Sequence, residues 1–271
     1  MPELPEVETI KNALVPRIVG RRVTGVELFW PRAVHVPSSE DLRAGLIGKR
    51  IESIARRGKY LLFRLSSGQT LILHLKMSGV LLLKPSGEAR ENHTTAVFRL
   101  DGGADLHFID QRKFGSIWLV ADEDEVIGKL GPEPLGNGFS TDRLRDLAAG
   151  RHVPIKVLLC DQNAVAGIGN MWADEALFAA RIHPMRSAGG LTAVEIDRLH
   201  AAIREVLERG ISQKGASVNT YRIPNGESGT AHSEFQVAHR RGEKCPACGT
   251  ALGYIKVRGR GTHFCPKCQK G

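Results

Sequence analysis

The chain opens with Met1-Pro2-Glu3-Leu4-Pro5-Glu6-Val7-Glu8, a stretch that allows two interpretations. It can be a helix start, with Pro5 at the first helical position and glutamates in the first turn, where they complement the helix dipole. Alternatively, removal of Met1 would leave Pro2 with a free secondary amine. An α-amino group titrates near ~7.7–8.0, so part of it is unprotonated and nucleophilic at neutral pH. Glu3 and Glu6 would then be possible proton carriers beside a nucleophile.

Length, charge and hydropathy bound the class of protein. The chain has 271 residues, enough for two domains with separate cores. Its formal net charge of +9 suggests a polyanionic partner, with nucleic acid as the first candidate. The N-terminus lacks the basic and apolar regions of a signal peptide, and no apolar run approaches ~18 residues. We therefore expect a cytosolic, reducing compartment and no membrane span.

The first half of the chain has the pattern of short β-strands. Turn signals such as Ser66-Ser67-Gly68 and Asp101-Gly102-Gly103 separate runs of mostly alternating apolar residues. We expect strands at residues 23–29, 50–55, 60–65, 70–75, 79–83, 96–100, 105–110 and 116–120. Strands of this length and spacing predict a β-sandwich or barrel.

The pattern changes at Gly131-Pro132-Glu133-Pro134-Leu135-Gly136, which has the composition of an interdomain hinge. Helical periodicity follows, and we expect helices at residues 141–149, 153–160, 170–180 and 192–209. The last of these has a capping box, Thr192 with Glu195, and Gly210 at its end. Residues 215–241 are polar and rich in Gly and Ser, which predicts either a long mobile loop or loosely packed surface.

The C-terminus carries a metal-binding pattern. Four of the five Cys lie in the last 27 residues, as two Cys-x2-Cys pairs separated by sixteen residues: Cys245, Cys248, Cys265 and Cys268. This spacing predicts one structural Zn²⁺, because each pair can grip the metal from a tight turn. Two disulfides are the alternative, which a reducing compartment disfavours. The residues between the pairs predict a hairpin with Arg258-Gly259-Arg260-Gly261 at its tip, suited to phosphate or a DNA groove, although a basic turn can also be plain solvated surface.

Several motifs occur in one order along the chain. They are the opening Pro2–Glu8 stretch, Arg57-Gly58-Lys59-Tyr60-Leu61-Leu62, His74-Leu75-Lys76-Met77-Ser78-Gly79, Asp110-Gln111-Arg112-Lys113-Phe114-Gly115, the hinge, Gly167-Ile168-Gly169-Asn170 and the four-Cys module. Together they resemble the formamidopyrimidine-DNA glycosylase family of bacterial base-excision repair enzymes, from end to end. The resemblance implies an α+β fold of two domains: an N-terminal β-sandwich with flanking helices, and a helical helix–two-turn–helix domain with a β-hairpin zinc finger. It implies boundaries at residues 1–131 for the sandwich, 132–140 for the hinge, 141–235 for the helical domain with a lesion-capping loop, and 236–271 for the finger.

The resemblance also implies catalytic roles. Pro2 resembles the family nucleophile, which displaces the damaged base at the sugar C1′ and holds the sugar as an imine. Glu3 resembles the acid that protonates the opening sugar ring, and Glu6 a second active-site carboxylate. Lys59 resembles the family lysine near the lesion's phosphate and sugar; without the resemblance it would be plain basic surface. Arg260 resembles the arginine that holds phosphate beside the nucleophile during the two strand-cutting eliminations.

Further residues are implied in DNA binding. Met77, Arg112 and Phe114 resemble the trio that fills the void left by a flipped-out base, although Met77 and Phe114 could instead be core. Asn170 resembles the residue that grips phosphate in the first turn of the helix–two-turn–helix motif.

Three more residues align with family positions that contact DNA. His93 and Arg151 fall where the family has basic residues that touch DNA. Glu175 matches a family carboxylate near the flipped base, and its alternative is a helix cap or surface acid. The chain departs from the family at two positions: Gln111 stands where the family usually has Pro, and His239 stands where Gly is common. The chain matches least well over residues 216–235, which leaves the lesion preference open.

The expected function is therefore a bifunctional glycosylase and abasic-site lyase that removes oxidised purines from damaged double-stranded DNA, working as a monomer in the bacterial cytosol. Leu4 favours this branch over the endonuclease VIII branch for oxidised pyrimidines, which usually has Gly there. A catalytically silent zinc protein that binds damaged DNA is a third possibility. A terminal secondary amine and Lys59 favour an enzyme, because binding alone has no use for that amine.

Overall fold

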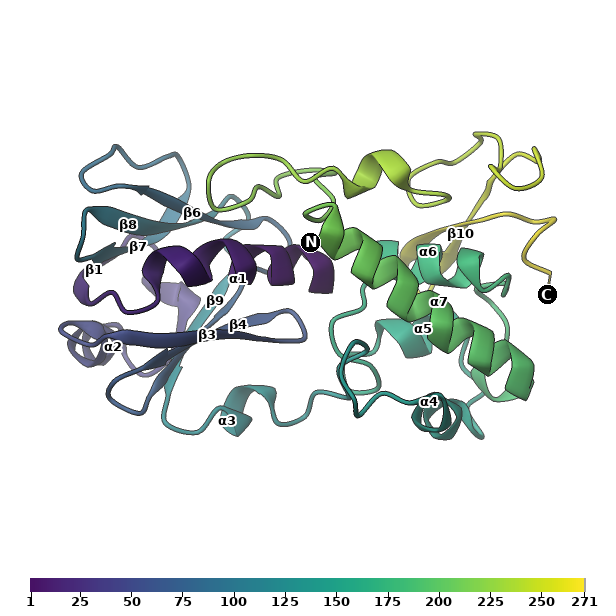
Figure 1. Ribbon diagram of the computed structural model, residues 1–271, viewed down its shortest axis with the longest axis horizontal. Coiled ribbons are helices and arrows are strands. Elements are labelled where there is room, and N and C mark those ends of the chain that lie inside the picture. The colour runs from purple at the N-terminus through teal and green to yellow at the C-terminus, as the bar shows by residue number, and fades with distance from the viewer. Residues whose placement is uncertain (271) are drawn as a thin grey trace. The chain divides into compact units, whose positions relative to one another are not determined.

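The computed structural model describes residues 1–270, which divide into two compact units (Figure 1). The first unit comprises Met1–Lys129 and Gln213–His232, and the second comprises Leu130–Ser212 and the chain from Ser233 onward. The change of unit at Lys129 and Leu130 lies just before the predicted hinge at residues 132–140. Within residues 1–270, no helix has both the length and the apolar character that crossing a membrane requires.

The first unit is a β-sandwich, as predicted. One sheet has the strand order β1-β7-β8-β6 and the other β2-β9-β5-β4-β3. Neighbouring strands are antiparallel, except that β2 and β9 are parallel. The strands are β1 (Val23–Leu28), β2 (Val34–Val36), β3 (Ile51–Arg57), β4 (Tyr60–Leu65), β5 (Thr70–His74), β6 (Gly79–Pro85), β7 (Thr94–Leu100), β8 (Ala104–Asp110) and β9 (Ser116–Val120). The helices are α1 (Leu4–Ile18), α2 (Ser39–Leu46), α3 (Asp124–Ile127) and the short η1 (Pro31–Ala33).

The core of this unit lies between the two sheets and α1. Alternate residues of β7, namely Ala96, Phe98 and Leu100, are buried in one cluster because successive side chains of a strand point to opposite faces. Helix α1 adds Val7 and Ile10 at helical spacing, both with no exposed surface. Each such aliphatic side chain contributes about 1.5–3 kcal/mol as an upper estimate. The start of α1, and with it the Pro2–Glu6 stretch, is therefore fixed to the sandwich.

A late part of the chain, segment 213–232, also belongs to the sandwich unit. The sequence predicted this stretch within the helical domain at residues 141–235. Its backbone is instead bonded to early residues: the Ala216 N–H donates to the Glu6 carboxylate at 2.9 Å, and the Leu83 N–H donates to the Pro224 carbonyl at 2.8 Å. Tyr221 and Ile223 complete the anchoring, since both are buried in the sandwich core. Hydrogen bonds and apolar burial thus place segment 213–232 with the first unit.

The second unit is mainly helical, as expected. Its helices are α4 (Thr141–Ala148), α5 (Ile155–Cys160), α6 (Asn170–Ala179), α7 (Ala193–Ser212) and the short η2 (Ala188–Gly190), and η3 (Ala231–Glu234) spans the boundary between the units. The predicted capping box of α7 is present: the Thr192 N–H donates to Glu195 at 2.8 Å, and the Glu195 N–H donates to the Thr192 hydroxyl at 3.3 Å. Strands β10 (Gly253–Val257) and β11 (Arg260–Phe264) form the predicted C-terminal hairpin.

Candidate active site and metal centre

The predicted nucleophile and its neighbouring carboxylates are buried at the start of α1. Pro2 is buried, Glu3 is 2% exposed and Glu6 has no exposed surface. One Glu6 oxygen accepts the Glu3 N–H at 2.8 Å, and the other accepts the Ala216 N–H at 2.9 Å. The Glu6 carboxylate therefore links the residue after Pro2 to segment 213–232. This geometry supports a positioning role for Glu6, with the carboxylate bridging two backbone amides.

Lys59 lies in the tight turn between β3 and β4 and is 5% exposed. Gly58 gives that turn its left-handed conformation, with φ of 57°. Arg56 fixes the turn to α1, because its guanidinium donates to Glu8 at 2.7 Å and to the Gly58 carbonyl at 3.0 Å. Burial raises the pKa of Glu8, but hydrogen bonds from Lys11 and Arg56 outweigh it, so the pKa is lowered and Glu8 stays charged. The sequence analysis did not identify this supporting role of Glu8 and Arg56, although Glu8 lies in the opening motif.

His74 lies at the end of β5, close to Lys59. Its Nδ1 accepts the Lys76 N–H at 2.9 Å, and its ring packs edge-on against Tyr60 with centroids 4.5 Å apart. Burial lowers the pKa of His74 to about 3, and the charges of Lys76 and Lys59 add to this effect. His74 is therefore neutral at physiological pH and adds no further positive charge beside Lys59.

The predicted void-filling trio gathers at the surface of the first unit. Met77 and Phe114 are 47% and 53% exposed, so neither is a core residue. The Arg112 guanidinium lies 3.2 Å from the Met77 sulfur and 4.9 Å from the centre of the Phe114 ring. The structure thus brings together three side chains from two separate loops.

Asp110 holds these two loops in place. It has no exposed surface, and its carboxylate accepts the Ser78 hydroxyl at 2.5 Å, the Arg112 N–H at 3.2 Å and the Gly115 N–H at 2.6 Å. A side chain at position 115 would meet Phe108 at 2.3 Å, so only glycine permits this close approach. Asp110 is the first residue of the Asp110–Gly115 motif, but its positioning role could not be predicted from the sequence.

A cavity of about 550 Å³ lies beside these loops, in the same unit. Its walls come from the sheet, from the loop before β7 and from segment 213–232. The lining residues include Ser78, Val80, Glu91, His93, Tyr221 and Arg222. The Tyr221 hydroxyl also donates to the Glu6 carbonyl at 3.3 Å, which connects this cavity to the start of α1. His93, predicted to contact DNA, lines the cavity.

In the second unit, a buried polar network fixes the hairpin. Lys156 and Asp174 are each 1% exposed and form an ion pair at 2.6 Å. The Lys156 ammonium also donates to the Thr262 hydroxyl at 2.8 Å and to the Gly261 carbonyl at 3.2 Å. The Asn170 amide donates to that same carbonyl at 2.8 Å. One signal of this network is visible in the sequence, namely a Lys inside the apolar run of α5.

These contacts fix the base of the hairpin turn, next to Arg260. Arg260 is exposed at the start of β11, and Arg151 is exposed between α4 and α5. The carbonyl oxygen of the Asn170 side chain is buried and has no hydrogen-bond partner among the described residues. The placement of Arg260 and Arg151 on the surface is compatible with the phosphate contacts that the resemblance implies.

Glu175 is buried in α6, with 2% of its surface exposed. Its carboxylate accepts the backbone N–H groups of Gln236, Val237 and Ala238 at 2.9–3.1 Å. Burial raises the pKa of Glu175, and these three hydrogen bonds oppose that effect. The arrangement gives Glu175 a structural function, which corresponds to neither a helix cap nor a surface acid. Its predicted contact with DNA stays a prediction.

The four C-terminal cysteines are placed for one metal ion. Their sulfur atoms all lie within 4.8 Å of one another, and Cys245–Cys268 and Cys248–Cys265 are separated by 3.9 and 3.5 Å. A disulfide needs about 2.05 Å. Tetrahedral zinc with Zn–S bonds of about 2.3 Å would place its sulfur ligands roughly 3.8 Å apart. The donor set therefore fits a structural Zn²⁺, which the four cysteines Cys245, Cys248, Cys265 and Cys268 would enclose completely.

A sandwich with a buried Pro–Glu start, a helical unit and a four-cysteine hairpin define the class of zinc-finger DNA glycosylases. Family models match the chain in three parts: the formamidopyrimidine-DNA glycosylase N-terminal domain over residues 1–117, the formamidopyrimidine-DNA glycosylase H2TH domain over residues 130–222, and the zinc finger found in FPG and IleRS over residues 242–271. The chain belongs to the formamidopyrimidine-DNA glycosylase family.

Relatives match over the full length. The formamidopyrimidine-DNA glycosylase of Symbiobacterium thermophilum is 48% identical, with 99% of this chain and 89% of that protein covered. That of Pelotomaculum thermopropionicum is 43% identical, covering 100% and 99%.

Solved structures from Lactococcus lactis agree with the fold. An FPG mutant in complex with Fapy-dG containing DNA has a TM-score of 0.94 and 39% identity, covering 100% of both chains. An Fpg complex with DNA containing an abasic site has a TM-score of 0.93 and 38% identity, covering 99% of this chain and 100% of that chain.

Proposed function

We propose that the protein removes oxidised purines from duplex DNA and then cuts the resulting abasic site. The observation that carries this proposal is the buried Pro2-Glu3 start of α1, in a chain that matches formamidopyrimidine-DNA glycosylases over its full length. Pro2 acquires a nucleophilic secondary amine once Met1 is removed. Lactococcus lactis relatives were solved in two separate complexes, one with Fapy-dG containing DNA and one with DNA that contains an abasic site. These two kinds of DNA are the substrate classes of the two proposed steps.

In the first step, the Pro2 nitrogen bonds to C1′ as the bond from C1′ to the base breaks, and the base leaves with a proton. Glu3 gives a proton to the ring oxygen as the sugar opens, which leaves a cationic imine between Pro2 and C1′. Lys59, held at the β3–β4 turn by Arg56, is suited to the nearby phosphate because an ammonium is a point charge. Glu6 keeps the residues around the nucleophile in place through its two amide contacts.

In the second step, the imine acts as an electron sink. Loss of the C2′ proton expels the 3′ phosphate, and a second elimination expels the 5′ phosphate. Arg260 is suited to hold phosphate during these steps, since a guanidinium binds phosphate in a fork. Zn²⁺ held by the four cysteines would stabilise the hairpin and supplies no open coordination position for chemistry.

A base inside a duplex cannot reach the nucleophile, so the enzyme has to flip it out. Met77, Arg112 and Phe114 are suited to fill the gap, because two are exposed apolar wedges and the third carries hydrogen-bond donors. The cavity beside His93 would receive the flipped base, with segment 213–232 as one wall. Asn170 and Arg151 would contact phosphates from the second unit.

We further propose that the protein acts as a monomer in the bacterial cytosol. Thiolate ligation of zinc by four cysteines is stable in a reducing compartment, where disulfides are disfavoured.

The test is borohydride trapping on a duplex with a single 8-oxoguanine, followed by intact mass and peptide mapping. We expect a covalent adduct on Pro2, in protein that lacks Met1, and a much lower yield in the Pro2→Gly variant, whose crippled base removal follows from the loss of the secondary amine. Pro5→Ala is the matched control, because it changes a proline of the same helix start that has no free amine. A protein without Met1 that binds the duplex and forms no adduct would contradict the proposal. An adduct that forms only with oxidised pyrimidines would change the proposed substrate from oxidised purines to oxidised pyrimidines.

A further inference from the structure

Two walls of the 550 Å³ cavity are joined by an ion pair. Arg222, in segment 213–232, donates to the Glu91 carboxylate at 2.7 and 3.3 Å. Glu91 lies in the loop between β6 and β7, and both residues line the cavity. The ammonium of Lys84 lies 3.5 Å from the same carboxylate. The hydrogen bond from Arg222 is the largest effect that lowers the pKa of Glu91, so the pair is charged at neutral pH.

The backbone on either side of Arg222 is already fixed. Tyr221 and Ile223 are 6% and 5% exposed and belong to the sandwich core, whereas Arg222 between them lines the cavity. The next residue, Pro224, accepts the Leu83 N–H at 2.8 Å. Arg222 is thus presented toward the cavity at a defined position. The loop that carries Glu91 forms the other wall of the cavity, and the ion pair connects this loop to Arg222.

We propose that the Glu91–Arg222 ion pair sets the width of this cavity and is a specificity-determining contact for base removal. The inference rests on the proposed function, in which the cavity receives the flipped base. An abasic site has no base to place there. The pair should therefore affect excision of a damaged base, and cutting at an existing abasic site should proceed without it.

The expected size of the effect is modest. Both side chains are about one-third exposed, at 35% and 36%, and ion pairs of this exposure are weak. We expect Glu91→Gln and Arg222→Gln each to lower kcat/KM for 8-oxoguanine excision by about three- to fivefold. Cleavage of a duplex with a preformed abasic site should stay within about twofold of the unmodified protein.

A double-mutant cycle separates this proposal from independent contacts with the base. If the pair acts as one unit, the double variant E91Q/R222Q should excise the base no more slowly than the slower single variant. If each residue touches the base separately, the two losses should multiply, which would overturn the proposal. Unchanged excision in both single variants, or an equal loss on the abasic duplex, would overturn it as well.

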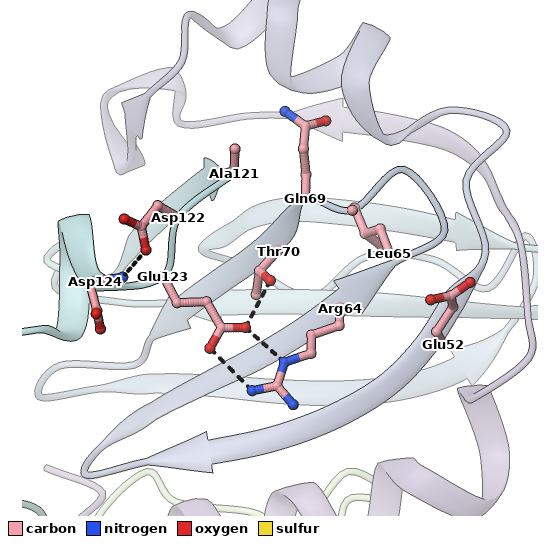
Figure 2. A pocket seen from close by; sticks show the side chains of 10 residues that line it. Glu52, Arg64, Leu65, Gln69, Thr70, Ala121, Asp122, Glu123 and Asp124 are labelled. Atoms are coloured by element: carbon pink, nitrogen blue, oxygen red, sulfur yellow. Dashed lines mark hydrogen bonds and ion pairs between the residues drawn. The ribbon is translucent and has the colours of Figure 1, made fainter.

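The chain offers a matched control in the same unit. Figure 2 shows Glu123 between Arg64 and Thr70, in a different pocket of about 500 Å³. Arg64 donates to Glu123 at 2.8 and 3.1 Å, so this ion pair has the same two-bond form. Glu123→Gln should leave both reactions unchanged; an equal loss of excision in this variant would show that the effect is general destabilisation. Failure of the unmodified protein to excise any base would instead reject the proposed function.

Discussion

At the scale of single residues, buried carboxylates of this chain organise backbone amides. Glu6 accepts N–H groups of Glu3 and Ala216, and Glu175 accepts three consecutive N–H groups at residues 236–238. Loops need such partners, because an unpaired buried N–H loses its hydrogen bond to water without replacement. An ionised carboxylate has several acceptor sites and suits this task. A buried acid in a sequence motif is therefore not by itself a proton carrier.

The first prediction concerns Glu175. Glu175→Gln replaces one accepting oxygen with an NH₂ group, which would face backbone N–H donors. We expect the free energy of unfolding of the second unit to fall by about 1–3 kcal/mol. Urea unfolding followed by near-UV absorption of the aromatic residues measures this loss. Unchanged stability together with weaker binding to lesion-containing DNA would favour the predicted contact with the base over the structural function.

The second prediction concerns His74. Its folded pKa of about 3 lies below the ordinary value of 6.5, so between these values the unfolded chain binds the extra proton. Stability is therefore fully present above about pH 6.5 and is lost as the pH falls toward 3. Between pH 6.5 and 5 the loss from this one group should be about 2 kcal/mol.

His74→Asn tests this directly, because it keeps an acceptor for the Lys76 N–H and does not titrate. We would measure urea unfolding of both proteins at pH 7, 6.5, 6, 5.5 and 5. The difference between the two free energies should shrink steadily as the pH falls. Parallel curves for the two proteins would show that His74 is protonated equally in the folded and unfolded chains.

At the scale of elements, the hairpin depends on a buried ion pair. Lys156 in α5 and Asp174 in α6 both contact β11, since Lys156 donates to Thr262 and Asp174 accepts the His263 N–H at 2.9 Å. Lys156→Met leaves the Asp174 charge buried without its main partner, so we expect a loss of about 3–5 kcal/mol in the stability of the second unit.

The double variant K156M/D174N removes both charges and should lose less than the sum of the two single variants. Chemical unfolding of all three variants measures these differences. Asp142→Asn, in the exposed Arg145–Asp142 pair of α4, is the control and should change little. A Lys156→Met variant as stable as the unmodified protein would show that the network does not hold the hairpin.

The elements that could be predicted from the sequence are those with a clear local pattern. Alternation in β7 and β8 and the Thr192–Glu195 capping box identified strands and a helix at nearly their observed positions. Helix α2 has only Leu42 and Leu46 as buried residues, too few to show a periodicity. The zinc site could also be predicted, because the spacing of the four cysteines along the chain is itself the signal.

Contacts between distant parts of the chain could not be predicted in this way. Segment 213–232 joins the sandwich through Ala216, which is 210 residues from its partner Glu6. Lys156 is likewise 106 residues from Thr262. Pro2 and Glu3 were candidates from the opening stretch itself, whereas Lys59 and the trio Met77, Arg112 and Phe114 came from the motif resemblance. Their supports appear only once the chain is folded: Glu8 and Arg56 beside Lys59, and Asp110 beneath the loops of the trio. Sequence patterns report local periodicity, and these supports are made by tertiary structure.

At the scale of the whole molecule, positive charge makes DNA binding depend on the salt concentration. The formal charge of +9 favours a polyanion, and each phosphate that a cation neutralises releases counterions. The logarithm of the binding constant should fall linearly with the logarithm of the salt concentration, by about 0.9 per contacted phosphate. Arg260 at the exposed hairpin tip is a candidate for one such contact. The last prediction is therefore that Arg260→Gln lowers this slope by about one.

Fluorescence anisotropy with a lesion-containing duplex at five salt concentrations gives the slope for each protein. Arg64→Gln is the control, because it removes the same charge from a guanidinium that is paired with Glu123. An equal change in both variants would mean that only total charge matters, whereas an unchanged slope for Arg260→Gln would place the hairpin tip away from phosphate. A lower slope for Arg260→Gln alone would identify a local contact, since the two variants have the same net charge.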